Sequence, residues 1–187
     1  MPARLAAFAV ALVLIAVPAA QAAPVPSGVL VVGDSLAVGM EPFLGAMIAP
    51  STVVWDARSG RTTPQGLVKL RARLREVTPQ TVVISLGTND GPDQRRFASR
   101  VERALLAIPA TACVVWLDIN RPPRKGRYHA LNRVLEEAAA RDPRMVLVHW
   151  DRAVLKGRVA LPDGLHPDAA GFQYRSLMIA GAVVGGC

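Results

Sequence analysis

The chain has 187 residues, of which 51% are hydrophobic and 5% aromatic, and its formal net charge is +8 at pH 7. This length suits one domain with a sizeable core. The positive charge is compatible with an anionic surface, such as a cell-wall polymer or lipid headgroups. The scarcity of aromatic residues and the absence of a known nucleic-acid motif argue against nucleic-acid binding.

The chain begins with the signature of a secretory signal peptide. A basic residue precedes an unbroken apolar run at residues 6–17, and a small-x-small site ends at Ala22. The alternative is an uncleaved membrane anchor, but the run is shorter than the roughly 20 residues that a bilayer span needs. We therefore expect a signal peptide at residues 1–22, cleaved near Ala22 or Ala23, and one mature domain at residues 23–187. The mature protein would be secreted or periplasmic, with no integral membrane segment.

Apolar runs alternate with segments of helical spacing through the rest of the chain. Five runs predict strands, at residues 29–32, 52–55, 81–86, 112–117 and 145–148. Helices are predicted after each of them, at residues 37–48, 67–77, 93–107, about 131–138 and 168–184. The strands are continuously apolar, which is typical of strands covered on both faces. The sequence thus predicts an α/β fold, a parallel sheet with helices on each side.

The first predicted strand stops at the turn Gly33-Asp34-Ser35, which has two interpretations. Asp34 or Ser35 is an ordinary helix N-cap, or the Ser35 hydroxyl is an exposed nucleophile. The second interpretation follows from position, because open α/β sheets hold their reactive groups at the carboxyl ends of strands. The Ser35 backbone N–H would then lie in the first helical turn, which favours anions. This segment alone leaves both interpretations open.

Further polar residues follow other strands at the same predicted edge of the sheet. Gly60 follows the second strand and Asn89 the third, whereas Asp163 and His166 lie in the loop before the last helix. A nucleophilic serine needs a base, a group that orients the base, and donors for an oxyanion. These residues together supply all three, so the nucleophile interpretation of Ser35 gains weight.

Three histidines are candidates for the base. His166 is favoured, because the Asp163-x-x-His166 spacing lets the carboxylate turn back onto the imidazole within one loop. His129 lies at a predicted helix start and is expected to be exposed. His149 ends the fifth predicted strand and reaches the same edge; its alternative interpretation is a hydrogen-bonded structural residue.

The motifs of this chain resemble the blocks of the SGNH/GDSL hydrolases. The blocks are Gly33-Asp34-Ser35-Leu36, Gly60, Gly87-Thr88-Asn89-Asp90 and Asp163-Gly164-Leu165-His166-Pro167. The resemblance implies a flavodoxin-like three-layer α/β/α sandwich with a five-stranded parallel sheet of order 2-1-3-4-5. It also implies that Ser35 is the nucleophile, His166 the base and Asp163 its orienting partner. The implied oxyanion donors are the backbone N–H groups of Ser35 and Gly60 and the side-chain amide of Asn89. The alternative roles are a turn residue for Gly60 and a turn or cap residue for Asn89.

The resemblance implies a secreted esterase that cleaves a carboxylic ester through an acyl-serine, without a cofactor. No metal is expected, because neither the histidines nor the cysteines form a ligand cluster. Three further features loosely resemble extracellular domains that move acetyl groups on cell-wall glycans: the segment 56–61, Asn132 and Trp150-Asp151. The alternative substrate is therefore an acylated glycan, with an O-acetyltransferase or acetylesterase activity. A non-catalytic wall-binding module is favoured by the charge but not by the intact serine, histidine and aspartate.

The two cysteines, Cys113 and Cys187, fit no zinc motif. Export would permit a disulfide between them. Cys113 begins the fourth predicted strand, at the edge opposite the candidate site. The last helix starts near His166 and returns over roughly 25 Å at 1.5 Å per residue, while a six-residue strand spans about 20 Å. The sequence therefore predicts a Cys113–Cys187 disulfide.

Overall fold

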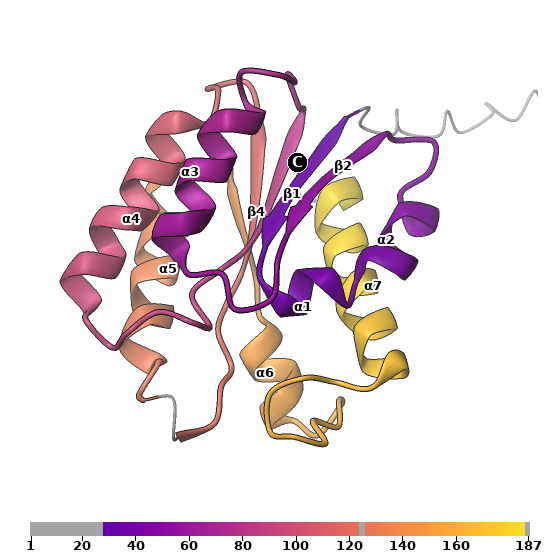
Figure 1. The fold of residues 1–187 in the computed structure, drawn as a ribbon, viewed down its shortest axis with the longest axis vertical. Helices are drawn as coiled ribbons and strands as arrows, with labels where there is room; N and C mark the ends of the chain where they lie inside the picture. The colour runs from indigo at the N-terminus through magenta and orange to yellow at the C-terminus, as the bar shows by residue number, and fades with distance from the viewer. Residues whose placement is uncertain (1–27, 124–125, 186–187) are drawn as a thin grey trace, which may run out of the picture.

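Five parallel strands form one sheet in the order β2-β1-β3-β4-β5 (Figure 1). The strands are β1 (Val29–Gly33), β2 (Val53–Ala57), β3 (Thr81–Ser85), β4 (Cys113–Leu117) and β5 (Met145–Val148). The computed structural model describes residues 28–123 and 126–185, so the expected signal peptide and its cleavage point lie outside the described residues. The parallel sheet and its order confirm the fold that the sequence predicts.

Helices cover both faces of the sheet because side chains alternate along each strand. Leu30 and Val32 of β1 pack in one core cluster, and Val29 and Val31 pack in another. The first cluster is covered by α3 (Thr63–Arg73), α4 (Gln94–Ala107) and α5 (His129–Arg141), and the second by α2 (Glu41–Met47) and α7 (Ala169–Gly185) (Figure 1). The protein is therefore a three-layer α/β/α sandwich.

Three helices differ from the sequence prediction. The helix expected at residues 37–48 is split into α1 (Ser35–Val38) and α2, whose first turn contains Pro42. Proline belongs in the first turn of a helix, because in the interior it lacks the N–H and clashes with the preceding turn. The helix α3 begins earlier than predicted, where Thr62 and Gln65 form a capping box. The six-residue helix α6 (Trp150–Leu155) occupies a segment expected to be a loop, because it is too short to show a clear period.

The last helix returns to the edge of the sheet where the strands begin. Cys113 is the first residue of β4 and packs against the core cluster that contains Val183 of α7. The helix α7 runs along this face of the sheet and ends at Gly185 (Figure 1). This course is the one that the disulfide prediction requires. Cys187 lies outside the described residues, so the Cys113–Cys187 bond stays a prediction.

All candidate site residues lie at the opposite edge, where the strands end. The loops that follow β1, β2 and β3 and the loop between α6 and α7 meet there (Figure 1). Within the described part of the chain, no helix combines the length and apolar character that a membrane span requires.

Candidate active site

The turn after β1 presents Ser35 as the first residue of α1. Asp34 is the N-cap of this helix, and its Oδ1 accepts the backbone N–H of Leu36 at 3.0 Å. The Ser35 Oγ, which takes no part in the cap, lies 2.8 Å from His166 Nε2. The two interpretations of the turn therefore apply to different residues: Asp34 caps the helix and leaves the half-buried Ser35 hydroxyl to the imidazole.

Gly33 allows the strand to pass directly into this turn. A Cβ atom at Gly33 would lie 2.2 Å from the Cβ of Ala37 and 3.2 Å from the Cβ of Ser85. The Asp34 N–H donates to the carbonyl of Ser85 at 3.0 Å, which fixes the turn against the end of β3. The close approach of these backbones explains why only glycine fits at the end of β1.

The loop before α7 folds Asp163 back onto His166. Asp163 Oδ1 accepts the backbone N–H groups of Leu165 at 2.8 Å and His166 at 2.7 Å, and its Oδ2 lies 2.8 Å from His166 Nδ1. The hydrogen bond from the imidazole, followed by those from the two backbone N–H groups, holds the pKa of Asp163 well below its usual range. With Nδ1 engaged by this carboxylate, Nε2 is the ring nitrogen that faces Ser35. The local Asp-x-x-His geometry is the one expected from the sequence.

The amide of Asn89 lies between the Ser35 turn and the loop after β2. Its Nδ2 donates to the carbonyl of Arg61 at 3.2 Å and lies 3.5 Å from Asp34 Oδ2. Gly60 is exposed in the same loop as Arg61 and has φ +75°, a conformation that favours glycine. Ser35 and Asp163 thus both contact His166, and Asn89 contacts the Ser35 turn. Gly60 is connected to this group through the neighbouring Arg61, whose carbonyl accepts from Asn89.

Arg61 anchors the Gly60 loop on β2. Its guanidinium is buried and donates to the Asp56 carbonyl and, at 2.7 Å, to Asp56 Oδ1. Arg73 Nε reaches the other carboxylate oxygen at 2.9 Å. Although burial alone would raise the pKa of Asp56, the hydrogen bonds from Arg61 and Arg73 hold it below its usual value. These contacts therefore fasten the loop beside the Ser35 turn.

A second arginine, Arg121, holds the loop that carries Asn89. Its buried Nη1 donates to the carbonyl of Thr88 at 3.2 Å and to that of Asp90 at 2.5 Å. Burial lowers the pKa of Arg121, and the charge of Asp90 opposes that change. Sequence reasoning missed this role, because Arg121 lies in a loop rich in basic residues where no spacing distinguishes it.

A second histidine–aspartate pair lies at the ends of β4 and β5. His149 Nδ1 is 3.2 Å from Asp118 Oδ2, and Asp118 Oδ1 accepts the Asp151 N–H at 2.6 Å. Burial raises the pKa of Asp118. His149 and Asp118 line an open cavity of about 410 Å³ between α5 and α6. His149 thus contacts Asp118 rather than Ser35, in accord with its interpretation as a hydrogen-bonded structural residue.

Asp34 differs from the other carboxylates of the site in being completely buried. Burial raises its pKa to about 6, although the Leu36 N–H, the charge of Arg175 and the Thr88 hydroxyl favour the ionised form. Burial therefore raises the pKa of Asp34, whereas hydrogen bonds lower that of Asp163. Among the described residues, no group of three His, Cys, Asp or Glu side chains is arranged to hold a metal ion.

Comparisons with known proteins show which family and which folds this chain is similar to. The sequence profile of the GDSL-like lipase/acylhydrolase family matches residues 31–174. An arylesterase of Vibrio mimicus is 31% identical over 157 residues, which cover 74% of this chain and 78% of the relative. Esterase TesA of Pseudomonas aeruginosa is 34% identical over 164 residues, covering 75% and 80%. The catalytic domain of Streptococcus pneumoniae peptidoglycan O-acetyltransferase A superposes with a TM-score of 0.67 at 16% identity, over 87% of this chain and 93% of that one.

Proposed function

The chain belongs to the GDSL-like lipase/acylhydrolase family, and on this premise we propose that it cleaves carboxylic esters through an acyl intermediate on Ser35. Its relatives are ester hydrolases, and the chain is an enzyme of the same type. One observation carries the assignment of residues: the series of contacts from Ser35 Oγ through the His166 ring to Asp163 Oδ2, each 2.8 Å long.

In the first half of the reaction, Ser35 Oγ attacks the ester carbonyl and His166 Nε2 accepts its proton. The bond to the alcohol oxygen breaks, and the imidazolium returns the proton to the leaving alcohol. In the second half, His166 takes a proton from water, whose oxygen attacks the acyl-serine. The carboxylic acid leaves and Ser35 regains its proton. Asp163 holds the imidazole in the required tautomer and stabilises the imidazolium.

In each half of the reaction, the carbonyl oxygen becomes a negatively charged oxyanion when the nucleophile adds to the carbonyl carbon. We assign its stabilisation to the backbone N–H groups of Ser35 and Gly60 and to the amide of Asn89. The Ser35 N–H belongs to the first turn of α1, where helical N–H groups have no internal partner. The position of the Asn89 amide between the Ser35 turn and the Gly60 loop supports this assignment.

The test of the proposal is turnover of p-nitrophenyl acetate and butyrate by Ser35→Ala. We expect no turnover above the uncatalysed rate and an unchanged circular dichroism spectrum, because Ser35 contributes no cap and is only half-buried. Substantial turnover by the purified variant would refute the nucleophile assignment.

The two histidine–aspartate pairs provide a matched control for the base. His166→Ala should remove turnover, whereas His149→Ala should leave kcat within a few-fold of the wild-type value, since each loses an imidazole that faces a carboxylate. The opposite result, with His149 essential and His166 dispensable, would reassign the base.

The second candidate function is acetyl transfer to or from a cell-wall glycan, supported by the net charge of +8. It uses the same residues and differs in the acceptor, a sugar hydroxyl in place of water. A series of acyl chain lengths with and without glycan acceptors tests it. Acetylated glycan as the main product supports the transferase, and free acid alone supports the esterase.

We further propose that the protein is exported and that residues 1–22 are removed. Mass spectrometry of the mature protein from a secreting host tests this proposal. An N-terminus near Ala23 is expected, and a chain that retains residues 6–17 would refute it.

A further inference from the structure

A buried arginine lies against the strand end that supports the Ser35 turn. Arg175 of α7 is 1% exposed, and its guanidinium lies 4.6 Å from the centroid of the Trp150 ring. Its Nη2 donates to Ser85 Oγ at 3.1 Å. Within the described part of the chain, its Nε and Nη1 have no hydrogen-bond partner. Burying a guanidinium without a contacting carboxylate is unfavourable, so stability alone does not explain this residue.

The pattern of α7 makes the arginine more unusual. Phe172, Ile179 and Val183 belong to the apolar cluster between this helix and the sheet. Arg175 lies three residues after Phe172 and four before Ile179, which places it on the same helical face. An apolar side chain is expected at such a position. Arg175 therefore places a positive charge at a position where packing against the sheet favours an apolar side chain.

The charge of Arg175 acts on two buried carboxylates, Asp34 and Asp118. Asp34 is fully buried, and the positive charge favours its ionised form against the effect of burial. Ser85 links the two residues: its hydroxyl accepts from Arg175, and its carbonyl accepts the Asp34 N–H at 3.0 Å. Arg175 is thus connected to Asp34 both through space and through one intervening residue.

The two carboxylate oxygens of Asp34 face different parts of the candidate site. Its Oδ1 accepts the Leu36 N–H in the Ser35 turn, and its Oδ2 lies 3.5 Å from Asn89 Nδ2. A proton on Asp34 would occupy one of these acceptor positions. Its negative charge alone would oppose an oxyanion forming nearby, and a buried cation offsets that repulsion.

We propose that Arg175 is a positioning residue for ester hydrolysis: its buried cation supports the Asp34 carboxylate and the strand end at Ser85, and Asp34 in turn holds the Ser35 turn and the Asn89 amide in the reactive arrangement. This inference rests on the proposed function, because it assigns a supporting residue to the same site. Arg175 touches neither Ser35 nor His166 in any described contact and acts through Asp34.

A double-mutant cycle with Arg175→Met and Asp34→Asn tests the inference, with kcat and KM measured on p-nitrophenyl butyrate. Arg175→Met should lower kcat by about 10- to 100-fold and leave KM within about threefold. In the Asp34→Asn background, where the carboxylate is already absent, the same change should alter kcat by less than about threefold. Equal losses in both backgrounds, or an unchanged kcat in the single variant, would overturn the inference.

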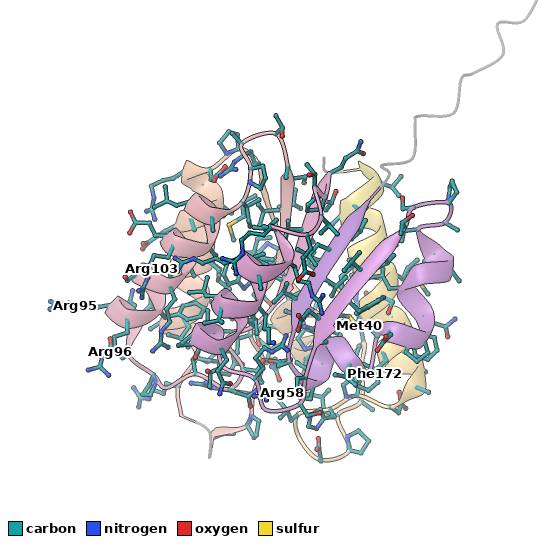
Figure 2. All side chains as sticks on the ribbon, turned by 45° about the horizontal axis from the view of Figure 1, so that its top comes forward. Met40, Arg58, Arg95, Arg96, Arg103 and Phe172 are labelled. Carbon is teal, nitrogen blue, oxygen red and sulfur yellow. The ribbon has the colours of Figure 1, made fainter. Side chains whose placement is uncertain are left out.

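Two further variants separate positioning from folding. Arg175→Lys keeps a buried cation and should restore kcat to within about fivefold of wild type; a kcat as low as that of Arg175→Met would count against a role for the charge. Arg103→Met is the matched control, because Arg103 is an exposed arginine on the outer side of α4 (Figure 2), and its kcat should not change.

Should Arg175→Met fail to fold, Asp34→Asn and the double variant remain comparable, since neither contains a buried unpaired carboxylate. Equal kcat values for these two support the inference, and a further fall in the double variant overturns it. Wild-type turnover and its loss in Ser35→Ala are measured in the same assay. Failure of the proposed function would appear there, independently of the Arg175 result.

Discussion

The two carboxylates of the candidate site, Asp34 and Asp163, have opposite electrostatic surroundings. Asp34 is completely buried, and burial raises its pKa to about 6. The side chain of Asp163 is 54% exposed, and hydrogen bonds from His166 and Leu165 hold its pKa well below the usual range. Asp163 therefore stays ionised beside the imidazole at any working pH, whereas Asp34 changes its charge within the mildly acidic range. The different pKa values of these two aspartates come from their environments and not from their residue type.

The raised pKa of Asp34 predicts a pH-dependent stability. The folded protein binds this proton more tightly than the unfolded chain. The contribution of Asp34 to the free energy of unfolding therefore decreases as the pH rises from about 4 to about 6. Asp34→Asn removes the titration and keeps an oxygen for the Leu36 N–H. Relative to wild type, its free energy of unfolding should rise by up to about 3 kcal/mol between pH 4 and pH 7, for a shift from 3.8 to about 6.

Urea unfolding of both proteins at several pH values measures this difference. Asp163→Asn is the control: because the folded pKa of Asp163 is lowered, its contribution changes below about pH 4 and is constant above. A difference between Asp34→Asn and wild type that does not vary with pH would contradict the prediction.

Asn89 is expected to act on the transition state. Its amide should strengthen its hydrogen bond as the carbonyl oxygen becomes an oxyanion, so loss of the amide should appear in kcat. Asn89→Ala should lower kcat by about 10²- to 10³-fold with KM little changed. Asn89→Asp should be at least as damaging, because it puts a carboxylate beside the developing charge. Values of kcat, KM and melting temperature decide the case: a destabilised variant with near-normal kcat would assign Asn89 to the turn alone.

At the level of the elements, the ends of three strands are fixed to one another by short polar contacts. The Arg58 N–H donates to the Gly33 carbonyl at 3.2 Å, and the Asp34 N–H donates to the Ser85 carbonyl at 3.0 Å. Arg61 and Arg121 fasten the two neighbouring loops from buried positions. The loops that carry Ser35, Gly60 and Asn89 are consequently tied to the strand ends and to one another.

The close packing at the end of β1 yields a prediction for Gly33→Ala. The added methyl group would meet the Cβ of Ala37, so the turn must shift. We expect a loss of about 1–3 kcal/mol in the free energy of unfolding and a marked fall in kcat. Gly45→Ala on α2 is the matched control, because nothing lies within 4 Å of its added Cβ; it should be neutral or stabilising. Equal stability of the two variants would contradict the packing argument.

For the whole molecule, α7 connects the two edges of the sheet. It begins after the loop that carries His166 and ends near the start of β4 (Figure 1). Between these ends, its residue Arg175 contacts Ser85. One helix therefore contacts the strand end below the candidate site through Arg175 and reaches the cluster that contains Cys113 through Val183. Changes at its far end are expected to affect stability more than catalysis.

The predicted Cys113–Cys187 bond would close a loop of about 75 residues and stabilise the fold by up to about 4.5 kcal/mol in the chain-entropy description. Reducing agent should lower the melting temperature of wild type and leave Cys113→Ser unchanged. Kinetic constants should stay the same, because Cys113 is at the opposite edge of the sheet from Ser35. Mass spectrometry of the non-reduced protein checks the bond, and alkylation of both cysteines would refute it.

Local patterns in the sequence determine much of this protein. Apolar runs predict the five strands; β1 and β3, at the centre of the sheet, are buried along their whole length, whereas the edge strand β2 is half-buried. The Asp163-x-x-His166 contact lies within one loop, so its geometry follows from short-range spacing. The break between α1 and α2 could also have been predicted, from the intolerance of helix interiors for Pro42.

Other features were decided only by the tertiary structure. The contact between Ser35 and His166 joins residues 131 positions apart and depends on the sheet bringing the two loops together. The contacts of Arg121 and the proposed role of Arg175 depend on their burial, and no local pattern reveals which arginines of a basic chain are excluded from water. The pairing of His149 with Asp118 follows from the adjacency of β4 and β5. Long-range packing sets the surroundings of each charge, and those surroundings determine what the charge can do.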